Sequence, residues 1–389
     1  METKITGIAW IAPHSSWGGS QEYIKLIAEK SEISQRKFIF CCSAHVEKYE
    51  SATRGVFSLS KDAINNYDAP SFFRRLLGAL SIALQVRAVV KNGQLSNVEK
   101  LLIHSNGSPL LCFFLSVLLP SKVCSFVTTF HDFGSLSKNK LRIAFNGILF
   151  LAAFIASGRK PIEIIFPSAH IHSQFCTDVS PKWKFMNMSV INTGIVLAPE
   201  NAHEKTSLEA RYRYGMIGRV AEAKAPFTWI EGVACYLQGG GNGTFCWIGD
   251  GPLLEECRAH VRDLGLHDRV FFPGYVDDLL SDTCSFGTLV FSSVWEGGCL
   301  PRGISEQLVL GKSAILPSLP SIRESFERAG CLHLVDFYSA DDSASLALAI
   351  MQHEKRPNSS TADIKAFIAK YHSFTTELSK TEAIYSKVY

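Results

Sequence analysis

The segment Thr288–Glu306 carries the most information about the fold, and it reads TLVFSSVWEGGCLPRGISE. It opens with a short apolar run, Thr288–Phe291, which has the length of a buried strand. A glycine-bearing loop with Glu296 follows, and Pro301 then suits the first turn of an apolar helix. This order predicts a ligand-binding edge of a parallel sheet, because loops at that edge lead into helix N-termini.

The same alternation of short apolar runs and helical patterns extends along the chain and predicts parallel sheets covered by helices on both faces. The predicted strands are Gly7–Ala12, Lys37–Cys42, Leu101–His104, Cys124–Phe130, Glu163–Pro167, Ser189–Asn192, Tyr214–Ile217, Thr244–Ile248, Val270–Phe272, Thr288–Phe291 and Ser313–Leu316. The predicted helices include Gln21–Lys30, Phe72–Lys91, Phe227–Leu237, Leu253–Leu264 and Pro301–Leu310.

A length of 389 residues is too great for one ordinary core and predicts two domains. The alternation pauses at Val196–Arg211, a polar, proline-bearing segment that is typical of a linker. We therefore expect Rossmann-like domains over residues 1–195 and 196–370. We expect the C-terminal helix of residues 371–389 to pack back on the N-terminal domain.

The net charge of +3 is unevenly distributed. Residues 1–195 hold 21 Lys and Arg against 12 Asp and Glu, a charge of +9, whereas residues 196–389 hold 18 against 24, a charge of −6. A basic half indicates an anionic partner, for which a phosphate-bearing lipid, a membrane surface or a nucleic acid would each fit, and chance scatter is the competing interpretation. We expect no nucleic-acid partner, because the basic residues do not interleave with aromatic ones in a recognisable module.

The 11 cysteines are scattered, apart from Cys41-Cys42, and show no Cys-x-x-Cys spacing. This pattern argues against a disulfide framework or a zinc site and indicates the reducing cytosol. We expect no signal peptide, because the N-terminus leads directly into the strand-like run Ile5–Ile11. The most apolar stretch, Ile143–Ala156, has 14 residues, fewer than the roughly 20 of a spanning helix. The expected location is cytoplasmic, including the inner face of the cell membrane.

Glycines and cations follow several predicted strands. Gly18 and Gly19 follow the first strand, where glycines let the backbone approach a ligand. Gly218-Arg219, with Lys224 five residues later, suits a diphosphate, because Arg binds phosphate in a bidentate way and Lys acts as a point charge. Taken singly, the glycines also fit a tight turn and the cations a solvated surface.

Two further residues are candidates for contacts with a ligand at these strand ends. His131 follows the strand Cys124–Phe130 and can hydrogen-bond a sugar hydroxyl or stabilise a developing charge, whereas an N-cap by Asp132 beside a bystander His is the alternative. Glu306 can accept both hydroxyls of a ribose, although acidic residues also favour helix starts in general.

Two motifs resemble other nucleotide sites without completing them. Gly311-Lys312-Ser313 is not a P-loop, because Glu306 stands where the first glycine belongs. Gly249-Asp250-Gly251-Pro252 lacks the third glycine of a dinucleotide fingerprint. Neither an NTPase nor a nicotinamide enzyme is supported.

Taken together and in order, these segments resemble the retaining GT-B glycosyltransferases of family 4 (glycosyl transferases group 1). The matching residues are Gly18-Gly19-Ser20-Gln21-Glu22, Gly218-Arg219 with Lys224, Gly249-Asp250-Gly251-Pro252, Phe272-Pro273-Gly274, and Glu296-Gly297 with Leu300-Pro301, Glu306 and Gly311-Lys312. The resemblance spans nearly the whole chain. It implies an α/β GT-B fold, in which an N-terminal acceptor-binding domain and a C-terminal nucleotide-sugar-binding domain face each other across a cleft.

The resemblance also implies an activity. A hexosyltransferase-type enzyme would move a sugar from a nucleotide-sugar, its co-substrate, to a glycan or lipid-linked acceptor with retention of anomeric configuration. It would need no metal and no further cofactor, and surface polysaccharide biosynthesis would suit it. The sequence leaves open a GT-B sugar-nucleotide epimerase and a non-catalytic GT-B partner protein.

Residue roles follow from the same resemblance. His131 and Glu296 would be the catalytic residues at the transferred sugar. The donor-binding residues would be Gly18, Gly19, Gly218, Arg219, Lys224, Gly274, Tyr275, Gly297, Gly298, Cys299, Leu300 and Glu306. Two departures stand out, since nine residues separate the two glutamates where the family has seven, and Asn192-Thr193-Gly194 replaces the usual Pro-Asn-Gly. The longer loop would alter the choice of donor.

The predicted helix that begins at Phe72 is both apolar and basic, with the sequence FFRRLL at residues 72–77. Such a face can lie in a membrane interface and meet anionic lipid through Arg74 and Arg75. Burial of the same face in the core is the alternative.

Overall fold

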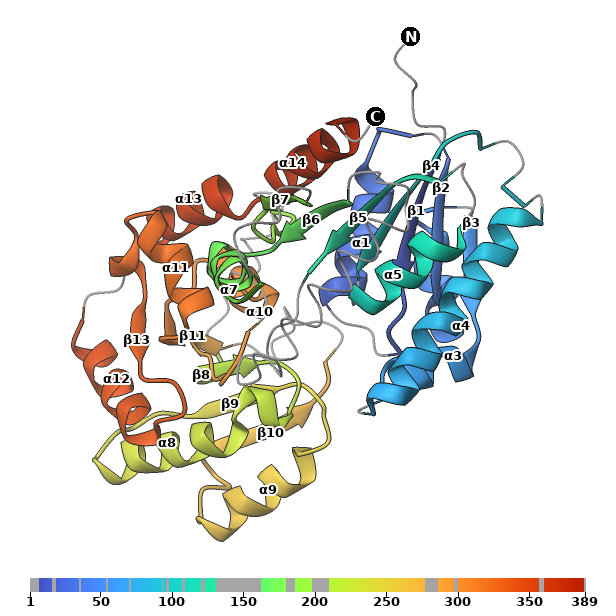
Figure 1. Ribbon diagram of the computed structural model, residues 1–389. Coiled ribbons are helices and arrows are strands. Elements are labelled where there is room, and N and C mark those ends of the chain that lie inside the picture. Colours follow the sequence, from blue (N-terminus) through green and yellow to red (C-terminus); the bar gives the residue numbers. More distant parts are fainter. Residues whose placement is uncertain are drawn as a thin grey trace. The chain divides into compact units, whose positions relative to one another are not determined.

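The computed structural model describes residues 7–15, 19–34, 36–53, 55–69, 71–92, 94–95, 98–106, 109–119, 123–130, 162–179, 186–197, 210–276, 286–296, 300–356 and 360–387. The chain divides into two compact units (Figure 1). Unit 1 comprises Met1–Ile191 and Glu377–Tyr389, and unit 2 comprises Asn192–Thr376. The predicted site residues that lie outside the described residues are Gly18, His131, Gly297, Gly298 and Cys299, and the apolar stretch Ile143–Ala156 lies outside them too.

Unit 1 is built on a seven-stranded parallel sheet with the order β3-β2-β1-β4-β5-β6-β7. Its strands are β1 (Gly7–Ala12), β2 (Lys37–Cys42), β3 (Gly55–Leu59), β4 (Leu101–Asn106), β5 (Val123–Thr129), β6 (Ile162–Phe166) and β7 (Met186–Val190). Its helices are α1 (Gly19–Lys30), α2 (Val46–Glu50), α3 (Lys61–Tyr67), α4 (Phe72–Lys91), α5 (Pro109–Leu118) and α7 (Ala169–Val179), and α14 (Phe374–Lys387) joins it from Glu377 onward.

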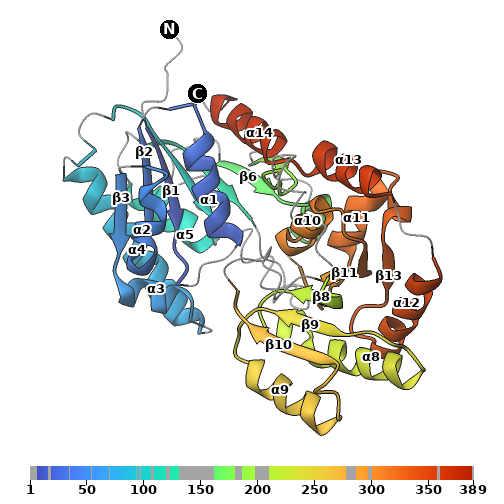
Figure 2. The same ribbon diagram turned by 180° about the vertical axis from the view of Figure 1, so that it is seen from behind.

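Helices cover both faces of this sheet, as the fully buried run of β1 requires. Ala9 and Ile11 belong to a core that includes residues of α4, α5 and α7. The alternate residue Trp10 points to the other face, where its indole N–H donates to the hydroxyl of Tyr385 in α14 at 3.1 Å. Figure 2 shows α1 on the side of this sheet that faces away from the viewer in Figure 1.

Unit 2 is built on a six-stranded parallel sheet with the order β10-β9-β8-β11-β12-β13. Its strands are β8 (Tyr212–Ile217), β9 (Phe245–Ile248), β10 (Val270–Gly274), β11 (Phe286–Val290), β12 (Ala314–Pro317) and β13 (Asp336–Tyr338). Its helices are α8 (Pro226–Gln238), α9 (Leu254–Asp263), α10 (Arg302–Val309), α11 (Pro320–Arg328), α12 (Ser343–Lys355) and α13 (Thr361–Tyr371), and a 3₁₀ turn covers Glu222–Lys224.

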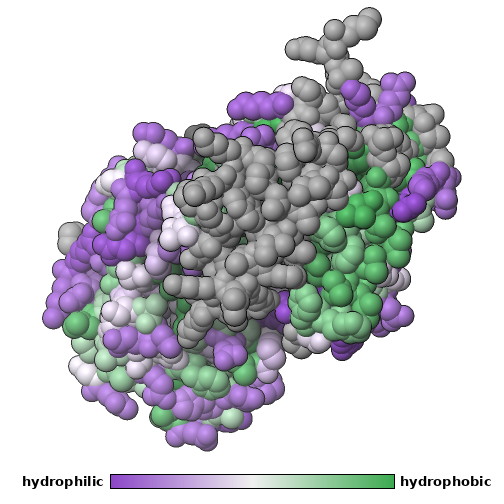
Figure 3. All heavy atoms as spheres, in the orientation of Figure 1, coloured by the Kyte–Doolittle hydropathy of each residue, from purple (hydrophilic) through white to green (hydrophobic). Residues whose placement is uncertain are grey.

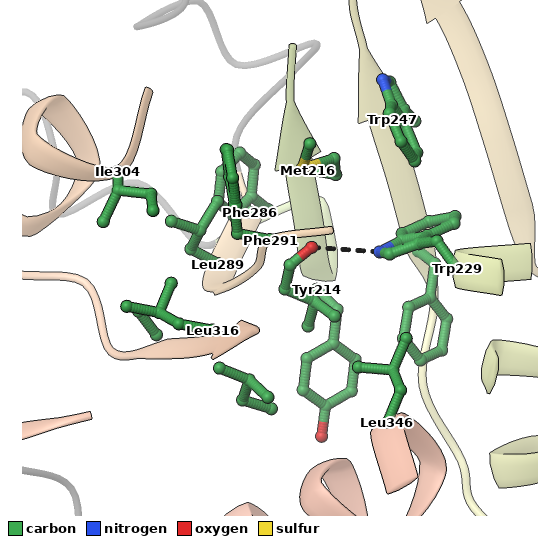
Figure 4. Packing of buried hydrophobic residues seen from close by; sticks show 14 of the residues in the cluster. Tyr214, Met216, Trp229, Trp247, Phe286, Leu289, Phe291, Ile304, Leu316 and Leu346 are labelled. Atoms are coloured by element: carbon green, nitrogen blue, oxygen red, sulfur yellow. Dashed lines mark hydrogen bonds between the residues drawn. The ribbon is translucent and has the colours of Figure 1, made fainter. Parts of the chain in front are cut away.

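Large aromatic side chains fill the core of unit 2 (Figure 4). Trp229 and Trp247 pack edge to face, with their ring centroids 5.4 Å apart. The indole N–H of Trp229 donates to the backbone oxygen of Val290 at 3.0 Å, the dashed line in Figure 4, so this buried polar group is satisfied. The contact ties α8 to β11 and thereby fixes the position of the loop that follows β11.

When the strands are numbered within each unit, both sheets have the order 3-2-1-4-5-6 over six strands. The strands are all parallel, but their order in the sheet changes direction between the first strand and the fourth. We call this point the strand reversal. In open parallel sheets, ligands bind outside the carboxyl ends of the strands at this reversal. The reversal lies between β1 and β4 in unit 1 and between β8 and β11 in unit 2. Both units are therefore Rossmann-like parallel-sheet domains, as the sequence predicted.

Candidate functional site

The carboxyl ends of β8 and β11 meet at the strand reversal of unit 2, and two predicted site residues bridge this point. Lys224, from the turn after β8, forms an ion pair between its Nζ and Oε1 of Glu296, which follows β11. Their side chains are 21% and 11% exposed, respectively. The Lys224 ammonium also lies 5.0 Å from the ring centroid of Phe291. A largely desolvated cation is thus held at the position where an open parallel sheet binds anions.

The loop that carries Glu296 is fastened to the loop that carries Lys224. The N–H of Val294 donates to Ala223 O at 3.0 Å, and the hydroxyl of Ser293 lies 2.9 Å from the same oxygen. Ser292 Oγ donates to Ala225 O at 3.2 Å, and Ser321 Oγ donates to Glu296 O at 3.1 Å. These contacts hold the two loops in register, so the ion pair is a built feature of unit 2.

Glycines allow the loops after β8, β9 and β10 to pack backbone against backbone. The N–H of Gly218 donates to Ile248 O at 3.0 Å, and the N–H of Gly249 donates to Gly274 O at 2.8 Å. A Cβ on Gly249 would lie 2.1 Å from Gly218 O, and one on Gly251 would lie 2.2 Å from Val220 O. No side chain fits at these two positions, which accounts for the Gly-x-Gly spacing in physical terms.

The beginning of α10 lies against the same edge of the sheet. A Cβ on Gly303 would lie 3.2 Å from Ile217 O at the end of β8, so this glycine allows a close approach of helix and strand. Arg302 Nη2 lies 3.3 Å from Glu306 Oε1, and the Glu306 side chain is 38% exposed. The side chain of Leu300 is buried in the core and anchors the start of the helix.

The structure brings several of the predicted donor residues together within unit 2. Gly218 and Lys224 are neighbours, since a Cβ on Gly218 would lie 3.9 Å from Lys224 Cε. Arg219 is exposed beside them. Gly274 joins the group through its hydrogen bond with Gly249, and the adjacent Tyr275 side chain is 73% exposed. In unit 1, the backbone of Gly19 begins α1.

Sequence reasoning missed a polar cluster at the strand reversal of unit 1. His14, two residues after β1, has its Nδ1 2.8 Å from Asp68 Oδ1. Ser15 donates to Asp68 Oδ2 through its N–H at 2.8 Å and its hydroxyl at 2.7 Å. Burial alone would raise the pKa of Asp68, but these hydrogen bonds outweigh it and lower the pKa. Because Asp68 lies 54 residues from His14, only the fold reveals the pairing.

A polar pocket at the opposite, amino ends of the strands of unit 2 is a poorer candidate. It is lined by Arg213, Tyr214, Thr288, His353, Glu354 and Arg356. Its cations already have acidic partners, since Arg213 lies 2.8 Å from Glu354 and Arg356 lies 2.5 Å from Asp336. The Gly311-Lys312-Ser313 segment also lies at this end, directly before β12, whereas a P-loop follows its strand.

Two curated relatives match short parts of the chain, and no protein-family model matches it. The chain is 31% identical over 101 residues to the Vi polysaccharide biosynthesis protein VipC/TviE of Salmonella typhi. This match covers 26% of this chain and 17% of that protein. It is 32% identical over 84 residues to the 2-deoxystreptamine glucosyltransferase of Streptomyces kanamyceticus. This match covers 21% of this chain and 22% of that protein. The chain thus matches only about a fifth of each relative's length.

Solved structures match the fold over almost the whole chain. HepE of Anabaena, determined in complex with UDP and glucose, has a TM-score of 0.72 at 15% identity, with 97% of this chain and 99% of that chain covered. Sucrose-phosphate synthase of Thermosynechococcus elongatus also has a TM-score of 0.72 at 15% identity, with coverages of 98% and 99%. The chain therefore has the GT-B fold that its sequence predicted.

Proposed function

We propose that this chain is a glycosyltransferase that transfers a hexose from a nucleoside-diphosphate sugar to a glycan or lipid-linked glycan in polysaccharide biosynthesis. The observation that carries the proposal is the Lys224–Glu296 ion pair at the strand reversal of unit 2. A cation and a carboxylate side by side match the two ends of such a donor, whose diphosphate is anionic and whose sugar offers hydroxyl groups. The GT-B fold and the names of the two curated relatives support the same class.

In this proposal the donor changes the partner of Lys224. The diphosphate competes with Glu296 for the ammonium, and the carboxylate is released to accept hydrogen bonds from the sugar. Arg219 provides a second cation, and Glu306 accepts from the ribose hydroxyls. The fixed cations stabilise the negative charge that develops on the leaving diphosphate, so the proposed transfer needs no metal. We propose retention of the anomeric configuration on the resemblance to family 4.

Unit 1 takes the acceptor in this scheme. The His14 ring is 39% exposed and its Nδ1 is engaged by Asp68, so Nε2 is the ring nitrogen left to meet a ligand. We propose that this nitrogen hydrogen-bonds an acceptor hydroxyl. His131 remains a candidate contact for the transferred sugar.

The test is a thermal-shift screen of UDP-, GDP-, ADP- and dTDP-sugars in the presence of EDTA. Wild type is compared with Lys224→Ala and Glu306→Ala, and with Arg328→Ala, whose side chain is 65% exposed on α11, as the matched control. A ligand at about 100 times its dissociation constant adds roughly 2.7 kcal/mol of stability. We expect one nucleotide class to stabilise wild type and Arg328→Ala, and to stabilise the two site variants far less.

Two outcomes would contradict the proposal. If no nucleotide shifts the melting of wild type, a non-catalytic GT-B partner protein becomes the better description. If a nucleotide-sugar binds but is converted to an altered free sugar without an acceptor, the chain is an epimerase. Anomer-resolved NMR of the product then tests retention.

A further inference from the structure

The outer side of α4 in unit 1 is apolar and exposed. Four of its side chains are large hydrophobic ones that face solvent: Phe72 is 52% exposed, Phe73 65%, Leu77 43% and Leu84 47%. The opposite side of the same helix is also apolar, because Gly78, Ala79, Ile82, Ala83, Val86 and Val90 are buried. A surface helix of a globular protein normally turns polar residues outward, so α4 departs from that pattern on one side only.

Three of the exposed apolar residues, Phe73, Leu77 and Leu84, lie on one stripe of α4 together with the partly buried Leu80. Positions 73, 77, 80, 84, 87 and 91 recur at intervals of three and four, which places them along one side of a helix. The first four of them are Phe, Leu, Leu and Leu, and the last two are Arg87 and Lys91. The stripe therefore joins an apolar segment about three turns long to a cationic end.

The adjacent helix α5 widens this surface. Its outward residue Val117 is 49% exposed, and its Phe113, Phe114 and Leu118 are only partly buried against the core. Figure 3 shows a green area over the part of unit 1 that α4 and α5 occupy in Figure 1. We call the outer sides of these two helices, with Arg87 and Lys91, the α4/α5 face. Contiguous apolar surface of this kind marks an interaction site.

The charges on this face are of one sign. Neither helix contains an acidic residue, whereas α4 contains Arg74, Arg75, Arg87 and Lys91. Arg74 Nε donates to Asn66 Oδ1 at 3.0 Å, so this guanidinium is engaged beside the stripe. Arg87 and Lys91 are the cations that lie on the stripe itself. An apolar surface with a basic rim is complementary to a bilayer that carries anionic headgroups.

We infer that the α4/α5 face docks on an anionic lipid bilayer, with Phe73, Leu77 and Leu84 inserted at the headgroup boundary and Arg87 and Lys91 paired with lipid phosphates. Among the described residues no helix is long and apolar enough to cross a membrane, and α4 in this arrangement lies along the surface. The inference rests on the proposed function only for its purpose, which is to bring unit 1 to a lipid-linked acceptor.

The test is flotation of the full chain with phosphatidylcholine vesicles that contain or lack phosphatidylglycerol. We expect flotation with the anionic vesicles and loss of it as salt rises. Arg87→Gln and Lys91→Gln should each weaken binding about fivefold, because a cation near an anionic surface contributes roughly 1 kcal/mol. Phe73→Ser should weaken it about tenfold, and the double variant Phe73→Ser/Leu84→Ser should abolish flotation.

Leu348→Ser is the matched control, because Leu348 is 55% exposed on α12 of unit 2 and lacks a basic apolar stripe around it. It should float as wild type does. Two results would overturn the inference. One is wild type that stays at the bottom with anionic vesicles. The other is a dimer that forms with rising protein concentration in light scattering and is absent in Phe73→Ser/Leu84→Ser. That result would mean that the face binds a second copy of the chain.

The proposed function can fail separately from this inference. Phe73→Ser/Leu84→Ser changes only exposed side chains of unit 1, so its nucleotide-induced thermal shift should equal that of wild type. Normal flotation without a nucleotide-induced thermal shift would contradict the proposed transferase activity and support docking through the α4/α5 face. A normal nucleotide-induced thermal shift without flotation would contradict docking and leave the proposed transferase activity standing.

Discussion

Units 1 and 2 have the same strand order over six strands, yet they present different chemistry in two places. At the strand reversal, unit 2 holds the Lys224–Glu296 ion pair, whereas unit 1 holds His14 with Asp68. On the outer surface, α4 of unit 1 exposes phenylalanine and leucine, whereas α9 of unit 2 exposes Glu255, Glu256, Arg262 and Asp263. One architecture therefore carries two sets of side chains, and function has to be argued from the sites rather than from the fold.

The difference has a physical consequence for each unit. A desolvated cation favours an anion strongly, because few water molecules compete for it. Unit 2 is thus suited to an anionic ligand such as the proposed donor. Removing an apolar outer face from water lowers the free energy, and this does not require a small ligand. Unit 1 is thus suited to a lasting contact with a surface.

The largest effect is expected at the ion pair of unit 2. Lys224→Ala should lower the rate of sugar transfer about 10²- to 10³-fold, the usual cost of removing one group that stabilises developing charge. Glu296→Gln should slow transfer to a similar extent but leave the binding of the nucleoside diphosphate as tight or tighter, because the competing carboxylate is gone. Transfer rates and calorimetric binding of the diphosphate separate the two effects.

His14→Ala in unit 1 provides the counterpart. It should raise the acceptor KM and leave diphosphate binding unchanged. If Glu296→Gln weakened diphosphate binding as much as Lys224→Ala does, the carboxylate would be holding the donor diphosphate site in shape rather than competing with the donor for Lys224. The proposed change of partner would then be wrong.

A smaller effect is expected at the glycine packing behind the ion pair. Gly249→Ala should lower the free energy of unfolding of unit 2 by about 3 kcal/mol, because the new Cβ would lie 2.1 Å from Gly218 O, which is backbone and cannot rotate away. Gly330→Ala is the matched control: its φ of +68° is also unfavourable for alanine, but no atom lies within 4 Å. It should cost about 1 kcal/mol. Equal losses in urea unfolding would show that backbone conformation alone matters.

The sequence predicted the elements of both units more completely at their centres than at their edges. The helix predicted at Phe72–Lys91 has those bounds in the structure, and the strands on either side of each reversal were found to within two residues. Strands β3 and β13 were missed. Both are edge strands and are only partly buried, so their sequences lack the continuous apolar run that marks a central parallel strand.

The candidate site shows a similar limit. Residues that follow a strand within a few positions, such as Gly218, Lys224 and Glu296, could be identified because parallel strands end at a common edge. The ion pair itself could not, because 72 residues separate its members and only the sheet order makes them neighbours. Asp68 was missed for the same reason. Asp68 follows no strand, and only the folded structure shows that it lies beside His14.

A buried histidine at the end of unit 2 should make the stability of this unit depend on pH. Burial lowers the pKa of His372 to about 4, and its Nδ1 lies 3.5 Å from Thr193 O beside the bridge between Ile195 and Ser373. The unfolded chain takes up a proton near pH 6.5 while the folded chain does not, so stability falls as pH drops from 6.5 towards 4. This histidine alone should contribute a loss of roughly 2 kcal/mol between pH 7 and pH 5.

His372→Gln should flatten this part of the stability curve. Urea unfolding at several pH values measures it, with a signal from the tryptophans of unit 2. A variant that retained the wild-type slope would assign the pH dependence to other groups.

The smallest effect is expected at the polar cluster of unit 1. Asp68→Asn should lower stability by about 1 to 2 kcal/mol at neutral pH, since the carboxylate accepts from His14 and twice from Ser15. Because the folded pKa of Asp68 is lowered, its contribution is present above the ordinary carboxyl pKa and disappears as pH falls through the folded value. Wild type and variant should therefore converge below about pH 4, a lower range than that of His372. A constant difference at all pH values would mean that Asp68 acts through shape rather than charge, and unit 1 would then have no ionised counterpart to the ion pair of unit 2.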